Sequence, residues 1–181
     1  PCKQNGKRFF RDISTIFIYN IFGVIWELIV KNKNSTGRGG AKTNEYKFED
    51  LKIGLEESFQ YEVTPEKIER FRELTGDINP LHVNDDFAAN YGFTGRVVYG
   101  MLSASLISTL GGVYLPGRYC LIHQIEGCKF LSPVYLEDVL TVTGTVRELN
   151  ESVKQAVISV SIRNQESKKV LKAILKVGFL E

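Results

Sequence analysis

An acidic side chain and an imidazole, Asp77 and His82, lie five positions apart in the segment DINPLH. Side chains that share a helical face are three or four positions apart, so this pair does not fit a continuous helix. Pro80 lies between them and favours a turn that can bring both side chains into one pocket. There, a carboxylate and an imidazole can position a water molecule and transfer its protons. The alternative is that Asp77 caps the next turn and His82 is a packed polar residue.

A glycine-rich loop leads into an uncharged segment, Met101 to Leu110, which we expect to be a helix. Gly100 then lies at or near the start of this helix, where the first N–H groups have no partner within the helix. The N–H of Gly100 can stabilise negative charge on a carbonyl oxygen, and the missing side chain lets a ligand approach closely. The alternative is that Gly100 only permits close packing of the helix on a sheet.

Three serines, Ser103, Ser105 and Ser108, lie in the same uncharged segment. None of them is part of the GxSxG sequence of a nucleophile elbow, so we do not expect a serine nucleophile. Ser105 and Ser108 are three positions apart and share a helical face. Either one of the three serine hydroxyls orients Asp77 or His82 by a hydrogen bond, or the serines are small residues that permit close packing.

Two other polar residues have simpler interpretations. Asn79 lies inside the DINPLH turn and can fix it through an Asx turn. His123, the second of only two histidines, lies in an expected strand, where a lone histidine is more often a surface or interface residue.

Two short helices are expected around the turn. Thr64 can cap the first helix, Pro65 suits its first turn, and Gly76 is its natural end. Asn84 can cap the second helix, which Gly92 ends. The later helix over 101–110 has no charged face, so we expect it to be buried on all sides and to stop at Gly111 and Gly112.

The remaining periodicity is that of strands. Residues 57–63 are rich in aromatic and β-branched side chains, and 140–146 and 155–162 alternate in polarity, which predicts strands that cover a core on one face. The second of these strands is expected to begin at residue 139, and further strands are expected over 119–130 and 170–179. One buried helix against an antiparallel meander is an α+β fold.

Composition limits the classes of function. The chain has 181 residues, of which 43% are hydrophobic and 24% charged, as in an ordinary globular domain. Its three cysteines have neither zinc spacing nor a CxxC motif, so we expect no metal, and reduced thiols in a cytoplasmic protein. Residues 46–181 hold fifteen Lys and Arg against eighteen Asp and Glu, which excludes a nucleic-acid binder by charge.

The first 45 residues differ in kind from the rest. They hold eight Lys and Arg against three Asp and Glu, and residues 13–30 are largely apolar. We therefore divide the chain into an extension and linker over 1–45 and a main domain over 46–181. Residues 9–33 are either a helix that packs against a partner, a weak contact to a membrane surface, or a segment without function.

Two motifs in the main domain resemble a known family. LTGDINPLHVNDDFA begins at Leu74, and GFTGRVVYGML begins at Gly92. Together with YEVTPEKIERFREL before them and FLSPVYLEDVLTVTGTV after the uncharged helix, they closely resemble the MaoC-like hydratases. This family includes (R)-specific enoyl-CoA hydratases and 3-hydroxyacyl-ACP dehydratases of fatty acid metabolism. The resemblance covers about residues 46–181 and implies a hot-dog fold, with a long central helix wrapped by an antiparallel sheet.

The resemblance also implies roles for individual residues. Asp77 and His82 match the catalytic pair that holds a water molecule, and Gly100 matches the glycine whose amide binds the thioester oxygen. Ser108 matches a serine that supports the pair, and Asn79 lies within the motif. Tyr99 occupies a position where some members carry histidine. The implied partners are acyl-CoA or acyl carrier protein and a second copy of the chain in a homodimer.

The sequence thus predicts a lyase that interconverts trans-2-enoyl and (R)-3-hydroxyacyl thioesters. We expect no cofactor, because no nucleotide loop, metal motif or flavin fingerprint is present. The alternatives are a hot-dog thioesterase and a non-catalytic subunit that binds acyl thioesters. A basic rim for a carrier protein has two candidates, Arg96 and Arg118.

Overall fold

The computed structural model describes residues 42–180, so the expectations for residues 1–41, including those for 9–33, lie outside the described residues. The elements run in chain order as η1 (Phe48–Asp50), β1 (Glu56–Glu62), α2 (Pro65–Thr75), α3 (Pro80–Val83), α4 (Asp85–Asn90), α5 (Gly100–Thr109), η2 (Leu110–Tyr114), β2 (Cys120–Phe130), β3 (Val139–Asn150), η3 (Glu151–Val153), β4 (Gln155–Arg163) and β5 (Lys169–Phe179). Among these residues, no helix is both long and apolar enough to cross a membrane.

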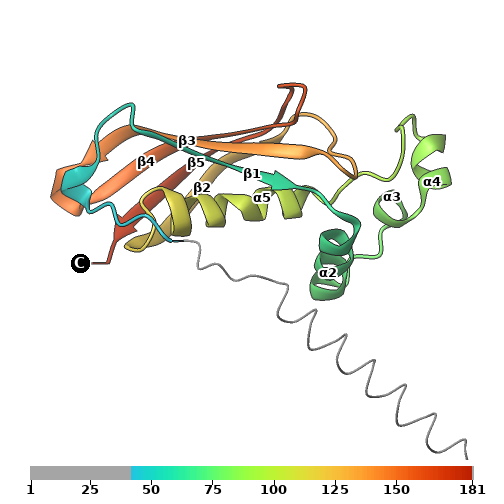
Figure 1. Cartoon of the computed structure of the whole chain (residues 1–181), viewed down its shortest axis with the longest axis horizontal. Helices are drawn as coiled ribbons and strands as arrows, with labels where there is room; N and C mark the ends of the chain where they lie inside the picture. The colour runs from blue at the N-terminus through green and yellow to red at the C-terminus, as the bar shows by residue number, and fades with distance from the viewer. Residues whose placement is uncertain (1–41, 181) are drawn as a thin grey trace, which may run out of the picture. The chain divides into compact units, whose positions relative to one another are not determined.

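The five strands form one antiparallel sheet in the order β1-β3-β4-β5-β2. Strands β3, β4 and β5 follow one another along the chain as a meander, while β1 and β2 form the two edges. The α5 helix lies along one face of the sheet, and α2, α3 and α4 lie toward one end of it (Figure 1). The predicted α+β class and the strand meander are confirmed.

The core lies between α5 and the facing side of the sheet. Alternate residues of β3 and β4 are buried, as the sequence pattern predicts. Leu102, Leu106 and Ile107 of α5 are buried against this face. A Cβ atom added to Gly144 would lie 2.7 Å from the Leu110 side chain, so a larger residue here would force this buried side chain to shift.

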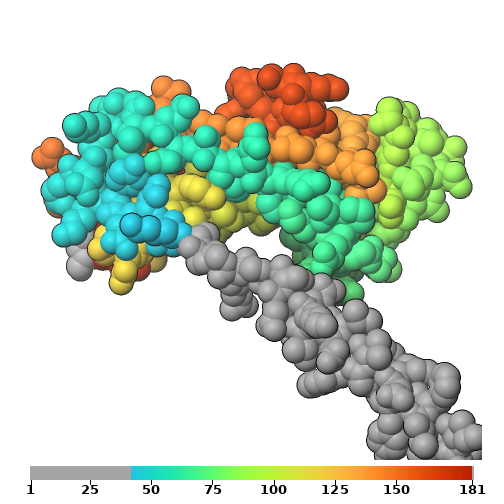
Figure 2. All heavy atoms as spheres, viewed as in Figure 1, coloured from blue at the N-terminus to red at the C-terminus, as the bar shows by residue number. Residues whose placement is uncertain are grey.

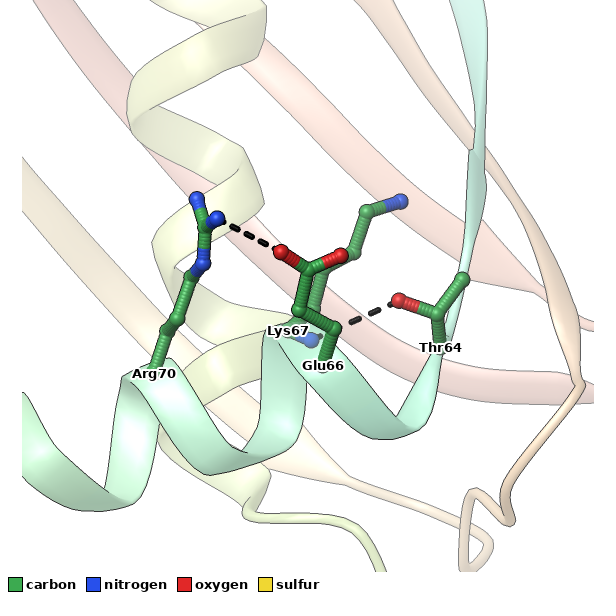
Figure 3. A network of polar contacts seen from close by, with 4 residues as sticks. All are labelled: Thr64, Glu66, Lys67 and Arg70. Carbon is green, nitrogen blue, oxygen red and sulfur yellow. Dashed lines mark hydrogen bonds and ion pairs between the residues drawn. The ribbon is translucent and has the colours of Figure 1, made fainter. Parts of the chain in front are cut away.

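The first predicted helix begins and ends as expected. Thr64 accepts a hydrogen bond from the backbone N–H of Lys67 at 3.4 Å (Figure 3). Pro65 is the first helical residue. Glu66 and Arg70 form an ion pair on the exposed face (Figure 3). Gly76 ends the helix in the left-handed conformation, with a φ of 69°. The chain therefore leaves α2 at a fixed point and enters the DINPLH turn.

Two expectations for the central helix are wrong. The helix does not stop at Gly111 and Gly112; it continues as a π-helical turn to Tyr114, which makes a central helix of 15 residues. Gly111 is buried, and an added Cβ would lie 3.1 Å from the Cys120 sulfur, so glycine serves close packing here. The helix is also not buried on all sides, because one sheet covers only one of its faces. The opposite face is an exposed stripe of Met101, Ser105, Ser108 and Gly112.

The α3–α4 segment extends past the end of the sheet (Figure 2, light green). The side chain of Asn84 caps α4 by accepting a hydrogen bond from the N–H of Phe87 at 2.9 Å, as predicted. This segment carries His82 at its beginning, so the site lies where the end of the sheet meets α2, α3 and the start of α5.

Candidate active site

The turn after α2 is fixed by its own side chains. The Asp77 carboxylate accepts a hydrogen bond from the N–H of Asn79 at 3.0 Å, and the Asn79 side chain accepts one from the N–H of Leu81 at 3.0 Å. Asn79 thereby caps α3, whose first residue is Pro80. Both Asp77 and Asn79 are exposed. The Asx interpretation of Asn79 is confirmed, and Asp77 also takes part in the turn.

His82 is held by the segment that leads into α5. Its Nδ1 atom lies 2.7 Å from the carbonyl oxygen of Val97, and the N–H of Val97 donates to the carbonyl of Leu81 at 3.1 Å. A carbonyl oxygen only accepts hydrogen bonds, so Nδ1 carries the proton when this contact is made. The Nε2 atom of the neutral ring then has a lone pair available to accept a proton.

Tyr99 connects the pieces of the site. Only 2% of it is exposed, and its ring centroid lies 4.2 Å from that of His82 and 5.3 Å from that of Phe71 on α2. Its hydroxyl donates a hydrogen bond to the backbone carbonyl of Asp77 at 2.8 Å. Burial raises the pKa of Tyr99, and the nearby Asp77 carboxylate adds to this. Sequence reasoning missed this role, because it depends on three segments that meet only in the fold.

A cavity of about 310 Å³ lies beside His82 at the start of α5. Gly100 and Ser103 line it on the helix side, and most of the other walls are apolar. Gly100 is the first residue of α5, so its N–H lies outside the hydrogen-bond ladder of the helix. A Cβ atom added to Gly100 would lie 3.1 Å from the Phe130 ring, so glycine keeps this wall open. An imidazole and a helix N-terminus thus share one largely apolar cavity.

A second cavity of about 230 Å³ also has His82 in its wall. Arg96 and Glu69 line it together with apolar side chains of α2. Arg96 forms an ion pair with Asp85 at 3.3 Å, and Arg118 forms one with Glu45 at 3.3 Å. Each candidate for a basic rim therefore already has an acidic neighbour.

The structure brings some of the predicted site residues together and separates others. His82 and Gly100 line the same cavity, and Asp77 and Asn79 lie in the turn just before His82 without lining it. Ser108 lies two helical turns after Gly100, on the exposed stripe, and does not line the cavity. The Ser105 hydroxyl donates to the carbonyl of Leu102 at 2.7 Å.

Three further predictions concern histidine, cysteine and metal. His123 is exposed on β2, where its Nδ1 lies 3.0 Å from the side-chain nitrogen of Gln155, and it lines neither cavity. Cys120 and Cys128 are free thiols, and burial raises the pKa of each. Within residues 42–180, no group of three or more His, Cys, Asp or Glu side chains is placed to hold a metal ion.

The fold agrees with the comparisons to known proteins. Residues 50–170 match the family model "MaoC like domain", and the chain belongs to this family of hot-dog hydratases and dehydratases. It is 37% identical over 102 residues to a 3-hydroxybutyryl-CoA dehydratase of Methylorubrum extorquens, covering 56% of this chain and 64% of the relative. It is 40% identical over 102 residues to an (R)-specific enoyl-CoA hydratase of Rhodospirillum rubrum, covering 56% and 70%.

A solved structure of the (R)-hydratase from A. caviae is similar in fold. The TM-score is 0.68 at 29% identity, and the match covers 72% of this chain and 98% of that chain. The family resemblance and the hot-dog fold expected from the sequence are therefore confirmed.

Proposed function

We propose that the chain is a hydro-lyase that interconverts trans-2-enoyl and (R)-3-hydroxyacyl thioesters by addition or loss of water. The observation that carries this proposal is that His82 and the first N–H group of α5, at Gly100, border one cavity in a member of the MaoC-like family. The contact with Val97 orients the His82 ring with Nε2 as the proton acceptor.

In the proposed reaction, the Asp77–His82 pair transfers protons and the Gly100 N–H binds the carbonyl oxygen. In the hydration direction, one member of the Asp77–His82 pair takes a proton from water while the water oxygen bonds to C3. The electrons of the C2–C3 double bond move toward the thioester carbonyl, whose oxygen gains negative charge that the Gly100 N–H stabilises. A proton then reaches C2 from the pair and the carbonyl re-forms, so that one water molecule is added in total.

The assembly and the carrier also belong to the proposal. We propose a homodimer, because Leu121, Ile122 and Ile125 are exposed on the edge strand β2, and Met101 on the exposed stripe of α5 is 65% exposed. Surfaces of this kind are typical of protein interfaces. Ser108 lies on the same stripe and does not line the cavity beside His82, so its proposed role of supporting the pair rests on the family resemblance alone. The carrier of the acyl group is either coenzyme A or acyl carrier protein.

The test is an assay of the purified chain with crotonyl-CoA, in which loss of the conjugated enoyl absorbance is followed over time. We expect formation of the (R)-3-hydroxy product, identified by chiral analysis, and no release of free thiol. In Asp77→Asn, the turnover number should fall by about 10²–10⁴, with Asp86→Asn, an exposed aspartate of α4, as the matched control.

Release of thiol without hydration would instead favour the thioesterase. Failure with short and long enoyl thioesters on both carriers would overturn the proposed lyase.

A further inference from the structure

Ser103 has a buried hydroxyl group that the fold does not use. The residue is 3% exposed, and its Oγ has no hydrogen-bond partner within the described part of the chain, residues 42–180. Buried hydroxyls nearly always have a partner, because an unpaired one has lost its water without compensation. A partner for Ser103 therefore has to come from outside these residues.

A helical serine can find such a partner in its own backbone, as a neighbouring serine shows. A serine in a helix can donate to the carbonyl three or four positions earlier. Ser105 does so, donating to the carbonyl of Leu102 at 2.7 Å. Ser103, on the same helix, leaves its hydroxyl unpaired. Ser103 therefore differs from Ser105 in that its hydroxyl makes no hydrogen bond to the helix backbone.

The position of Ser103 indicates what the hydroxyl can bind. Ser103 lines the same cavity as Gly100 and His82. It follows Gly100 by three residues, so the two lie on one face of the first helical turn. Gly100 has no side chain to separate its N–H from the Ser103 hydroxyl. Gly100, whose N–H lies outside the hydrogen-bond ladder of the helix, and Ser103, whose hydroxyl is unpaired, therefore line one small cavity.

We propose that the Ser103 hydroxyl donates a second hydrogen bond to the thioester carbonyl oxygen, beside the N–H of Gly100. This inference rests on the proposed hydratase function. A carbonyl oxygen has two lone pairs and can accept from both donors. The charge on this oxygen grows as water adds to C3, so both hydrogen bonds strengthen in the transition state and raise turnover more than ground-state affinity.

The first test compares Ser103→Ala with Ser105→Ala, its matched control on the same helix. With crotonyl-CoA, Ser103→Ala should lower kcat by about 10- to 1000-fold and change KM little, whereas Ser105→Ala should stay within about twofold. The melting temperature of Ser103→Ala should equal or exceed that of the wild type, because an unpaired buried hydroxyl is removed. An unchanged kcat, or a kcat lowered only together with the melting temperature, would overturn the inference.

The second test measures binding and does not depend on turnover. Calorimetry compares butyryl-CoA with S-butyl-CoA, a thioether that lacks the carbonyl oxygen. The wild type should prefer the thioester, and Ser103→Ala should lose most of that preference while binding the thioether equally well. An unchanged preference would show that Ser103 does not bind the carbonyl. If the wild type shows the preference but hydrates no enoyl thioester, the hydratase proposal fails and the role of Ser103 stands.

Discussion

The Nδ1 atom of His82 lies 2.7 Å from the carbonyl oxygen of Val97, fifteen residues later in the chain. This contact joins the short helix after the DINPLH turn to the segment that begins the central helix. It also decides which ring nitrogen holds the proton, because the carbonyl can only accept. The ring of Tyr99 packs against the same imidazole, so the orientation of His82 is set from two sides.

Two substitutions of His82 separate the catalytic role from the structural one. Both His82→Asn and His82→Ala remove the imidazole ring, but His82→Asn keeps an N–H near the position of Nδ1 that can donate to Val97. Both variants should lose about 10²–10⁴ in turnover, because neither retains an Nε2 base. His82→Ala should lose about 1 kcal/mol more than His82→Asn in the free energy of unfolding, because it also loses the hydrogen bond to Val97. Substantial hydratase activity in His82→Asn would show that His82 does not transfer the proton.

Gly100 and Gly112 form a second matched pair on the central helix. A Cβ added to Gly100 would lie 3.1 Å from the Phe130 ring, while one added to Gly112 has no heavy atom within 4 Å apart from its chain neighbours and its own helix. Gly100→Ala should lower turnover at least tenfold, because the methyl group narrows the cavity beside the helix N-terminus. Gly112→Ala should keep its activity and gain up to about 1 kcal/mol in stability from helix propensity. The free energy of unfolding and the initial rate of hydration of each variant check this.

A loss of turnover in Gly100→Ala has two possible causes, the added methyl group itself or a displaced Phe130 side chain. Its side chain is 53% exposed and can move outward. The double variant Gly100→Ala, Phe130→Ala relieves the close contact but leaves the methyl group in the cavity wall. It should stay as slow as the single variant, and recovery of the rate would show that only a displaced Phe130 caused the loss.

Single residues in the sequence predicted where several of the helices begin and end. The cap at Thr64, the left-handed Gly76 and the cap at Asn84 all follow from the conformational preferences of single residues, which require no tertiary information. Gly111 shows the limit of such signals. A glycine pair favours a helix end, but the buried approach of Gly111 to the Cys120 sulfur favours continuation of the helix.

Some residues of the candidate site could be predicted from the sequence, and others are evident only in the fold. Asp77, His82 and Gly100 stand out because their types and spacing suit acid–base and oxyanion chemistry. Tyr99 and Ser103 do not, since one is defined by contacts with three segments and the other by the absence of a partner within the described residues. The strand order β1-β3-β4-β5-β2 was likewise not available from the strand pattern, because hydrophobic alternation does not determine which strands pair.

Tyr99→Phe tests the link between the central helix and the DINPLH turn. The variant keeps the ring against His82 and loses only the hydrogen bond to the Asp77 carbonyl. It should lose about 1 kcal/mol in stability and several-fold in turnover, because the loop that carries Asp77 is held less firmly. The hydration assay and denaturant unfolding measure both effects. A variant with full activity would show that the turn positions Asp77 without Tyr99.

The buried hydroxyl of Tyr99 also makes the stability of the folded chain depend on pH. Burial raises its pKa in the folded chain, so the unfolded chain releases the hydroxyl proton first as the pH rises past about 10. The stability contribution of this group is present below that pH and is lost above it. The wild type should therefore lose more stability between pH 9 and pH 11 than Tyr99→Phe does, in denaturant titrations at each pH. Equal losses would contradict the burial of the hydroxyl.

Cys120 provides a test of the packing at the far end of the central helix. Burial raises the pKa of its thiol to about 11, from 9.0. Because only the thiolate reacts with iodoacetamide, Cys120 in the folded chain at pH 8.5 should be alkylated about 100-fold more slowly than in urea. Mass spectrometry of the labelled peptides would measure this rate, with the same residue in urea as the reference. Equal rates in the folded and the unfolded chain would show that the thiol is accessible and that the contact between Gly111 and Cys120 opens readily.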